Sequence, residues 1–134
     1  MLRLEFKTGQ WDAMRAHVVR CFPEEACGLL AGNGEIIKVI FPVTNRLHSR
    51  SRFEMDPKVQ LDIFNMIERS HLELLGIYHS HPMGPDYPSV TDIDSFLYPG
   101  VAYLIWSYQA ETWKVQGFTI ETGSYSQILL EFLG

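Results

Sequence analysis

The stretch Gly76-Ile77-Tyr78-His79-Ser80-His81-Pro82 decides how this chain folds and what chemistry it can carry. Its apolar first half belongs to the run Leu74–His79, which has the length of a buried strand. One residue separates the two histidines, and side chains two positions apart on a strand point to the same face. The sequence therefore predicts two imidazoles that converge on one point, as metal binding requires.

A third donor follows this strand after a short loop. The segment Met83–Pro88 is rich in proline and glycine, and Ser89-Val90-Thr91-Asp92 has the pattern of a capped helix start. Because the loop lets the chain fold back, Asp92 can supply the third protein ligand that a catalytic zinc usually has. Asp94 is a rival third ligand. A set of two histidines and one aspartate also admits iron, manganese or cobalt.

Elsewhere the pattern indicates an α/β domain with a mixed sheet. One helix is predicted from Thr8, its N-cap, to Cys21. A second helix is predicted from Pro57 onward, with Val59, Ile63, Met66 and Ile67 on its inner face. A third, short helix is predicted after Ser89. Strands are predicted at Leu2–Phe6, Ala26–Ala31, Glu35–Val43, Phe53–Asp56, Leu74–His79, Val101–Ser107, Trp113–Ile120 and Ser126–Phe132. No linker divides the chain, so residues 1–134 are expected to form a single domain.

Composition narrows the class of protein. The 134 residues are 46% apolar with a formal charge of −5 and a pI near 5.4, which disfavours nucleic-acid binding. No apolar stretch approaches the roughly 20 residues of a membrane span, and the first residues lack a signal-peptide core, so a cytoplasmic location is expected. Cys21 and Cys27 are expected to be reduced. The basic cluster in Arg46–Arg52 predicts a solvated loop that could contact a carboxylate-bearing partner.

The spacing His79-x-His81-x7-Ser89-x-x-Asp92 resembles the signature of the JAMM/MPN (Mov34/MPN/PAD-1) zinc metalloproteases. Upstream, the segment Pro-Glu-Glu-Ala-Cys-Gly-Leu at 23–29 is similar to the segment that holds the catalytic glutamate of that family. This glutamate lies three residues before a glycine, which selects Glu25 over its neighbour Glu24. The resemblance runs from about Glu24 to Trp106. It implies a cytidine-deaminase-like fold, in which helices flank a curved mixed sheet.

The resemblance also implies a role for each motif residue. His79, His81 and Asp92 are expected to bind Zn²⁺, Glu25 to act as general base and Ser89 to stabilise the oxyanion. These roles agree with the chemistry, because zinc acidifies water, a free carboxylate can carry a proton to the leaving amine, and one oxyanion donor contributes ~3 kcal/mol. Cys27 shares the strand face of Glu25 and is a conceivable nucleophile, but a buried core position is expected. Other histidines, His17, His48 and His71, lack ligand spacing and are expected at the surface.

The short chain resembles the compact bacterial and archaeal members of the family. The segments His79–Asp92, Val43–Arg46 and Phe53–Pro57 are similar to those of peptidases that release cysteine from a sulfur-carrier protein. The resemblance thus implies cleavage after the C-terminal glycine of a ubiquitin-like or sulfur-carrier protein, with cysteine as the favoured leaving amine and a lysine side chain as the other. A small-peptide peptidase and a non-catalytic MPN scaffold are the alternatives, although scaffolds usually lack a ligand. A homodimer is also compatible with the resemblance.

Overall fold

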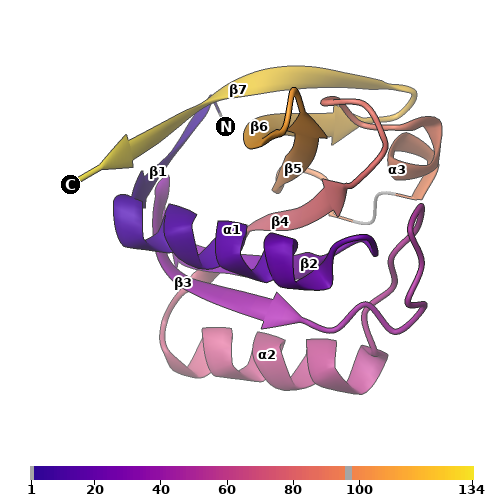
Figure 1. Cartoon of the computed structure of the whole chain (residues 1–134). Helices are drawn as coiled ribbons and strands as arrows, with labels where there is room; N and C mark the ends of the chain where they lie inside the picture. The colour runs from indigo at the N-terminus through magenta and orange to yellow at the C-terminus, as the bar shows by residue number, and fades with distance from the viewer. Residues whose placement is uncertain (1, 96–97) are drawn as a thin grey trace.

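The computed structural model describes residues 2–95 and 98–134 and shows a strongly curved mixed β-sheet with helices packed on it (Figure 1). The helices are α1 (Thr8–Cys21), α2 (Pro57–Arg69) and α3 (Val90–Ser95). The strands are β1 (Arg3–Lys7), β2 (Cys27–Asn33), β3 (Ile36–Val43), β4 (Glu73–His81), β5 (Ala102–Gln109), β6 (Thr112–Glu121) and β7 (Ser124–Leu133). No helix in the described ranges has both the length and the apolar character needed to cross a bilayer.

The sheet curves until it closes on itself. Its strand order is β1-β3-β2-β4-β5-β6-β7, and β1 pairs in parallel with both β3 and β7, which joins the two edges. Strands β4 and β5 are parallel, whereas β2 pairs in antiparallel fashion with both β3 and β4. The predicted curved mixed sheet with flanking helices is therefore confirmed, and the closure adds that β1 joins β3 to β7.

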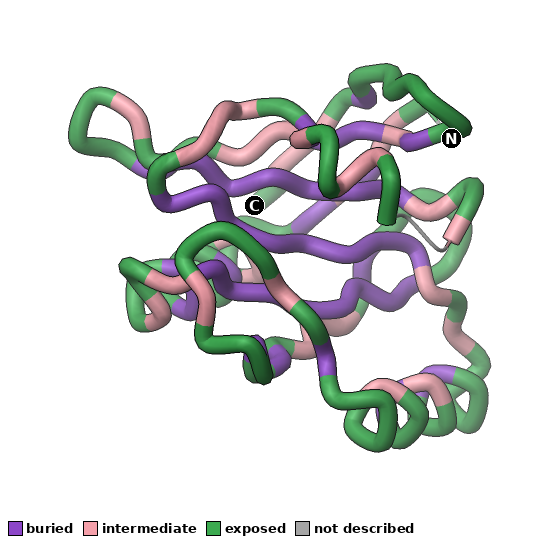
Figure 2. The backbone as a smooth tube through the Cα atoms, turned by 90° about the vertical axis from the view of Figure 1, so that its right-hand side faces the viewer, coloured by how far each residue is buried: buried purple, intermediate pink, exposed green. Residues whose placement is uncertain are grey.

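Helices α1 and α2 cover opposite faces of the central strands. Met14 and Val18 of α1 pack in one apolar cluster with Trp106, while Ile63 and Ile67 of α2 pack in a second. Because both faces are covered, the central strands are buried along most of their length (Figure 2). This burial explains why their sequences are continuous apolar runs rather than alternating ones.

Both main helices were predicted, but some details of their ends and faces were wrong. The N-cap of α1 is Lys7 rather than Thr8, and the backbone N–H of Lys7 donates to the Gln10 side chain at 2.9 Å. In α2, Pro57 takes the first position as predicted. Val59 and Met66 are each 42% exposed, and the buried residues of this helix are Ile63 and Ile67, with Phe64 packed beside them.

The strand predicted at Phe53–Asp56 does not form. The segment is irregular because Glu54 bonds to the preceding loop instead of to the sheet. Its N–H donates to the Asn45 side chain at 3.2 Å, and its carbonyl accepts from the Arg46 N–H at 2.9 Å. Phe53–Asp56 therefore belongs to one long connection from β3 to α2.

The surface position predicted for His17 is also wrong. This side chain is 7% exposed, and its Nδ1 lies 2.7 Å from the hydroxyl of the fully buried Tyr78. Burial, assisted by the charge of Arg20, lowers the pKa of His17, which favours a neutral imidazole. The pair holds the Tyr78 ring in place beneath the site-bearing end of β4.

We expect Gly28→Ala to destabilise the fold, because a Cβ at this position would overlap the ring of Tyr78. The ring is buried and held by His17, so it cannot move aside cheaply. The expected loss in free energy of unfolding is about 1–3 kcal/mol, measured by urea denaturation. Gly9→Ala is the matched control, since nothing lies near a Cβ there and alanine favours a helix. Equal stability of the two variants would show that the Tyr78 ring is free to move.

Candidate metal centre

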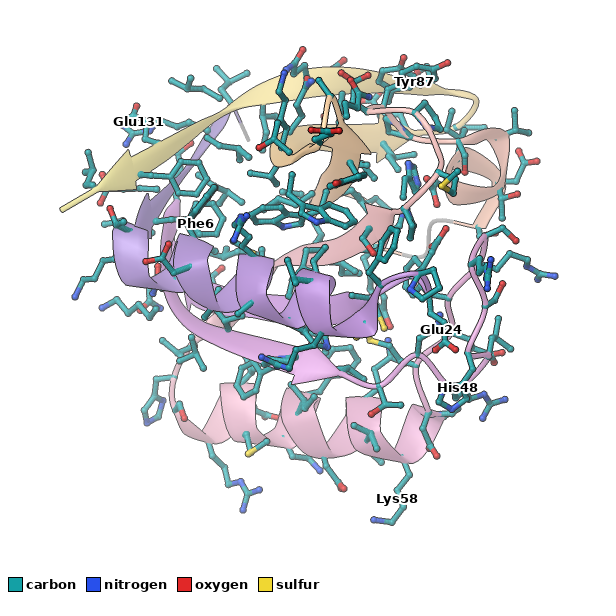
Figure 3. The ribbon with its side chains drawn as sticks, in the orientation of Figure 1. Phe6, Glu24, His48, Lys58, Tyr87 and Glu131 are labelled. Carbon is teal, nitrogen blue, oxygen red and sulfur yellow. The ribbon has the colours of Figure 1, made fainter. Side chains whose placement is uncertain are left out.

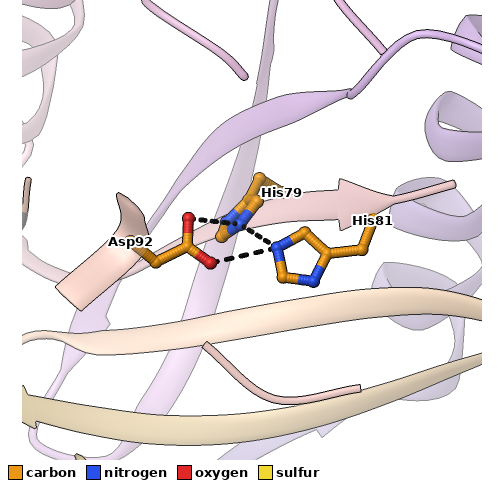
Figure 4. Close-up of side chains that lie close together, drawn as sticks. All are labelled: His79, His81 and Asp92. Atoms are coloured by element: carbon orange, nitrogen blue, oxygen red, sulfur yellow. Dashed lines mark hydrogen bonds and ion pairs between the residues drawn. The ribbon is translucent and has the colours of Figure 1, made fainter. Parts of the chain in front are cut away.

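Strand β4 and helix α3 bring together three side chains that could hold a metal ion (Figure 4). His79 Nε2 lies 3.0 Å from His81 Nε2 and 3.1 Å from Asp92 Oδ1. Asp92 Oδ2 lies 3.0 Å from His81 Nε2. The two histidines share a strand face as their spacing predicted, and α3 places Asp92 against both.

The donor set fits a small divalent ion. Around a tetrahedral zinc with bonds of about 2.0–2.1 Å, neighbouring donor atoms lie about 3.3 Å apart. The separations of 3.0–3.1 Å within the cluster are slightly shorter than this, so an ion would need only a small expansion. Asp94, the rival ligand, is exposed and lies outside the cluster among the described residues.

Neighbouring groups orient two of the three donors through hydrogen bonds. His81 Nδ1 lies 2.7 Å from the carbonyl oxygen of Pro85, a contact that places its proton on Nδ1 and leaves Nε2 to face the cluster. Asp92 Oδ2 accepts from the Ser89 N–H at 2.8 Å, and Ser89 Oγ accepts from the Asp92 N–H at 3.1 Å. The predicted capping box thus also holds the candidate ligand.

His79 is oriented by packing as well as by the contact of its Nε2 with Asp92. Its ring stacks on Phe53, with centroids 4.7 Å apart and planes inclined by 30°. Its Nδ1 is buried and has no hydrogen-bond partner within residues 2–95 and 98–134. The irregular segment that carries Phe53 is therefore part of the wall that fixes this ligand.

The charges of the cluster depend on one another. Burial lowers the pKa of His79 against the opposing effect of Asp92. Burial also acts to lower the pKa of His81, but the bonds to Asp92 and to Pro85 outweigh it and leave that pKa raised. For Asp92, burial opposes ionisation, and hydrogen bonds from the two histidines overcome it, so its pKa falls well below the ordinary value. The metal-free cluster thus holds an ionised carboxylate against imidazole, and a metal must compete with protons for it.

Glu25 lies beside this cluster, two residues before strand β2, and lines the same cavity as His79 and Asp92. The Ser80 N–H donates to the Ala26 carbonyl at 3.0 Å, and the Ala26 N–H donates to Ser80 Oγ at 2.8 Å. These bonds continue the antiparallel register in which Cys27 lies opposite His79, so Glu25 comes opposite His81. Across an antiparallel pair, opposed residues share a face. Glu25 is 5% exposed, and its carboxyl belongs to the same face as the three donors.

Burial raises the pKa of Glu25 to about 8; the His81 charge opposes this and the Asp92 charge adds to it. A carboxyl with a pKa near neutrality can both take up and release a proton at physiological pH. Its rival Glu24 is turned to the surface, where its Oε1 lies 3.3 Å from His48 Nδ1 (Figure 3). The structure therefore places Glu25, and not Glu24, against the cluster.

A cavity of about 350 Å³ opens beside the cluster. Glu25, His79 and Asp92 form one wall. The remaining lining residues come from the β3–α2 connection, the start of α2, strands β4 and β5 and the α3 region: Ser51, Arg52, Phe53, Glu54, Met55, Pro57, Gln60, Ile77, Thr91, Ser95, Tyr98 and Tyr103. The cavity lets a small group reach the cluster from the side of the sheet that carries α2.

Residue patterns did not reveal three residues that position the site. Ser80 lies between the histidines and points to the opposite face, where it fixes the register with Ala26. Asn45 is buried in the β3–α2 connection, and Phe53 stacks on His79. The alternation of a strand could have flagged Ser80, but nothing local marks the other two.

Cys27 is a buried core residue as expected, and burial raises the pKa of its thiol to about 12, which makes it unsuitable as a nucleophile.

Comparison with known proteins identifies the class of protein. Residues 7–118 match the family described as prokaryotic homologs of the JAB domain, and the chain belongs to that family. The expected JAMM/MPN relationship is thereby confirmed. A solved structure of a protein from Desulfitobacterium hafniense superimposes with a TM-score of 0.86 at 29% identity, covering 96% of this chain and 92% of that one. A JAB1/MPN domain protein from Archaeoglobus fulgidus, at 17% identity and a TM-score of 0.66, shares the fold over 98% of this chain and 100% of that chain.

Characterised relatives carry activities in their names. The chain is 38% identical over 88 residues to a desampylase of Haloferax volcanii, covering 63% of each protein. It is 43% identical over 86 residues to a probable TtuB-protein conjugate cleaving protease of Thermus thermophilus, covering 63% of this chain and 57% of that protein. It is 35% identical over 96 residues to a CysO-cysteine peptidase of Mycobacterium tuberculosis, covering 70% and 66%. The chain thus spans about three fifths of the length of these relatives.

We expect Asp92→Asn to lose most of its affinity for a divalent ion such as zinc or cobalt. An amide has nearly the shape of the carboxylate, but it offers one oxygen instead of two and lacks the charge that binds the ion. Asp94→Asn is the matched control on the same helix and should bind as wild type does. Metal titration by calorimetry, with circular dichroism to verify folding, measures both variants. If Asp92→Asn bound the metal and Asp94→Asn did not, the third ligand would be Asp94 rather than Asp92.

The raised pKa of Glu25 makes the metal-free protein less stable at high pH. Between the ordinary pKa of about 4.5 and the folded value of about 8, the folded state holds a proton that the unfolded state has lost, so stability falls as pH rises. Because each pKa unit corresponds to about 1.4 kcal/mol, the loss is on the order of 2–5 kcal/mol. Urea denaturation in chelator at pH 4.5, 6.5 and 8.5 should show Glu25→Gln gaining stability relative to wild type as pH rises. A constant difference across this range would contradict the burial of an ionisable group at position 25.

Proposed function

We propose that the protein is a zinc-dependent hydrolase that cleaves the amide bond after the C-terminal glycine of a ubiquitin-like or sulfur-carrier protein. Residues 1–134 form its single catalytic domain. The observation that carries the proposal is the placement of a buried glutamate with a raised pKa opposite His81, on the face shared by His79, His81 and Asp92. A cytoplasmic location remains a prediction from the sequence.

In this proposal, His79, His81 and Asp92 hold the zinc, which when bound supplies a Lewis acid and lowers the pKa of water. Glu25 takes a proton from the attacking water and delivers it to the departing nitrogen. The water oxygen bonds to the glycine carbonyl carbon while the carbon–nitrogen bond breaks. The products are the carrier carboxylate and a free amine. An amide nitrogen leaves poorly as an anion, so this proton transfer is the step that needs Glu25.

Ser89 is the proposed donor to the developing oxyanion. Its Oγ accepts the Asp92 N–H, which leaves the hydroxyl proton free to be donated elsewhere. Ser89 is partly exposed and lies next to the candidate ligand Asp92, so a substrate carbonyl that reaches the zinc can meet this hydroxyl. One such donor contributes ~3 kcal/mol to the transition state of acyl transfer.

Two leaving groups fit the names of the relatives. The desampylase and the TtuB-protein conjugate protease point to a carrier joined to a protein, and the CysO-cysteine peptidase to a carrier joined to cysteine. We favour cysteine, because the 350 Å³ cavity beside Glu25 is at the small end of ligand pockets. A scaffold role is disfavoured because all three donors are present and converge.

The test is an intact-mass cleavage assay on the zinc-loaded protein. One ubiquitin-like carrier is offered with either cysteine or a lysine side chain on its C-terminal glycine, and we expect faster release of cysteine. Glu25→Gln should keep its zinc but lose at least about 100-fold in turnover, since general acid–base catalysis contributes that much. Preferred cutting at lysine would make the protein a deconjugating protease. Failure to cut either form, with zinc bound, would overturn the proposed function.

A further inference from the structure

We propose that Arg52 binds the free α-carboxylate of the leaving amino acid, so that the enzyme selects a carrier joined to one amino acid over a carrier joined to a protein. This inference rests on the proposed function and specifies its leaving group. It also assigns a role to the basic cluster in the β3–α2 connection, which the metal centre and Glu25 do not use.

The position of Arg52 is the first support. Arg52 lines the same cavity as Glu25, His79 and Asp92. In a single amino acid, one carbon separates the amine nitrogen from the carboxylate. A carboxylate on the leaving amine must therefore lie close to the group that protonates that amine, which is Glu25. A lysine side chain in a protein carries no carboxylate at this distance from its nitrogen.

The charge of Arg52 is the second support. Within the described part of the chain, no hydrogen bond or ion pair of its guanidinium is found, although its neighbours are engaged. Glu54, which also lines the cavity, pairs with Arg46 at 3.1 Å, and Lys58 pairs with Asp62 at 3.3 Å. Arg52 is thus an exposed cation at the edge of the cavity whose guanidinium makes no such bond among the described residues, and a guanidinium is the side chain best suited to a carboxylate.

Asn45 fixes the relative placement of Arg52 and Glu25. Its Nδ2 donates to the Glu25 carbonyl at 3.0 Å and to the Arg52 carbonyl at 2.9 Å. Its Oδ1 accepts from the Leu47 N–H at 3.1 Å and from the Glu54 N–H at 3.2 Å. One buried amide thus ties the backbone of the proposed base to that of the proposed carboxylate-binding residue. The Glu25 N–H is held by the same connection, through the Ser49 carbonyl at 2.8 Å.

The experiment compares two substrates that differ only at the carboxylate with a third whose leaving group is a lysine side chain. The probes are a synthetic peptide ending in Gly-Gly-Cys, the same peptide with a C-terminal carboxamide, and the same peptide joined through its last glycine to the side chain of N-acetyl-lysine amide. The zinc-loaded proteins are wild type, Arg52→Gln, Arg52→Lys and Arg50→Gln. Arg50 is the matched control, because it is an exposed arginine of the same segment and does not line the cavity.

For wild type we expect KM for the free acid to be about 10- to 100-fold below that for the carboxamide, the usual size of a charge-assisted hydrogen bond. Arg52→Gln should abolish this difference with little change in kcat, Arg52→Lys should restore part of it, and Arg50→Gln should keep it. Equal KM for acid and carboxamide in wild type would overturn the proposal. So would an equal rise in KM for all three peptides in Arg52→Gln, which would place Arg52 against the carrier rather than the leaving group.

Binding separates a failure of this inference from a failure of the proposed function. Calorimetry with zinc-loaded Glu25→Gln and the double variant Glu25→Gln/Arg52→Gln measures affinity for the acid and carboxamide peptides without turnover. We expect the acid to bind about 10- to 100-fold tighter only when Arg52 is present. If the acid peptide bound more tightly but wild type did not cleave it, only the proposed hydrolase activity would be contradicted. Absence of the preference, with cleavage intact, would contradict the role of Arg52 alone.

Discussion

The pairing of Ala26 with Ser80 is the constraint on which the site depends. Two hydrogen bonds, one of them made by the Ser80 side chain, hold the start of β2 against the end of β4 and place Glu25 opposite His81. A shift of one residue in this register would turn Glu25 to the other face of the sheet, away from the candidate metal ligands His79, His81 and Asp92. Gly28 permits the pairing because the Tyr78 ring occupies the space that a Cβ would take.

Burial gives the site its chemistry and also makes it costly to form. Desolvation raises the pKa of Glu25 to about 8, and the same low-dielectric surroundings oppose the ionisation of Asp92. Hydrogen bonds from the two histidines, the charge of His79 and the Ser89 backbone N–H together keep Asp92 charged. A buried, partly compensated set of charges of this kind seldom adds to stability. Its arrangement is instead suited to a cation, whose charge would compensate Asp92 and whose ligand directions are already set by Pro85 and by the capped start of α3.

The β3–α2 connection is the second organising element. It has no regular secondary structure, yet the four hydrogen bonds of Asn45 give it a defined shape and attach it to the Glu25 backbone. The same connection carries Phe53, which stacks on His79, and Arg52, which lines the cavity. This connection contacts the candidate metal ligand His79, the proposed base Glu25 and the cavity. It can therefore both position the candidate metal centre and select which groups reach it.

Local sequence determined the three candidate metal donors, the candidate base, the helix that carries Asp92 and nearly all strands, because strand alternation, a capping box and short-range spacing are read within a few residues. It also favoured Glu25 over Glu24 through the distance to Gly28. The tertiary structure alone decided the closure of the sheet, the burial of His17, the irregular path of Phe53–Asp56 and the roles of Asn45, Phe53 and Arg52. The burial of His17 and the positions of Asn45 and Phe53 depend on partners far away in the chain: Tyr78 for His17, Glu25 for Asn45 and His79 for Phe53. Residue patterns carry no record of such contacts, because hydrogen bonds and packing between distant segments exist only once the chain has folded.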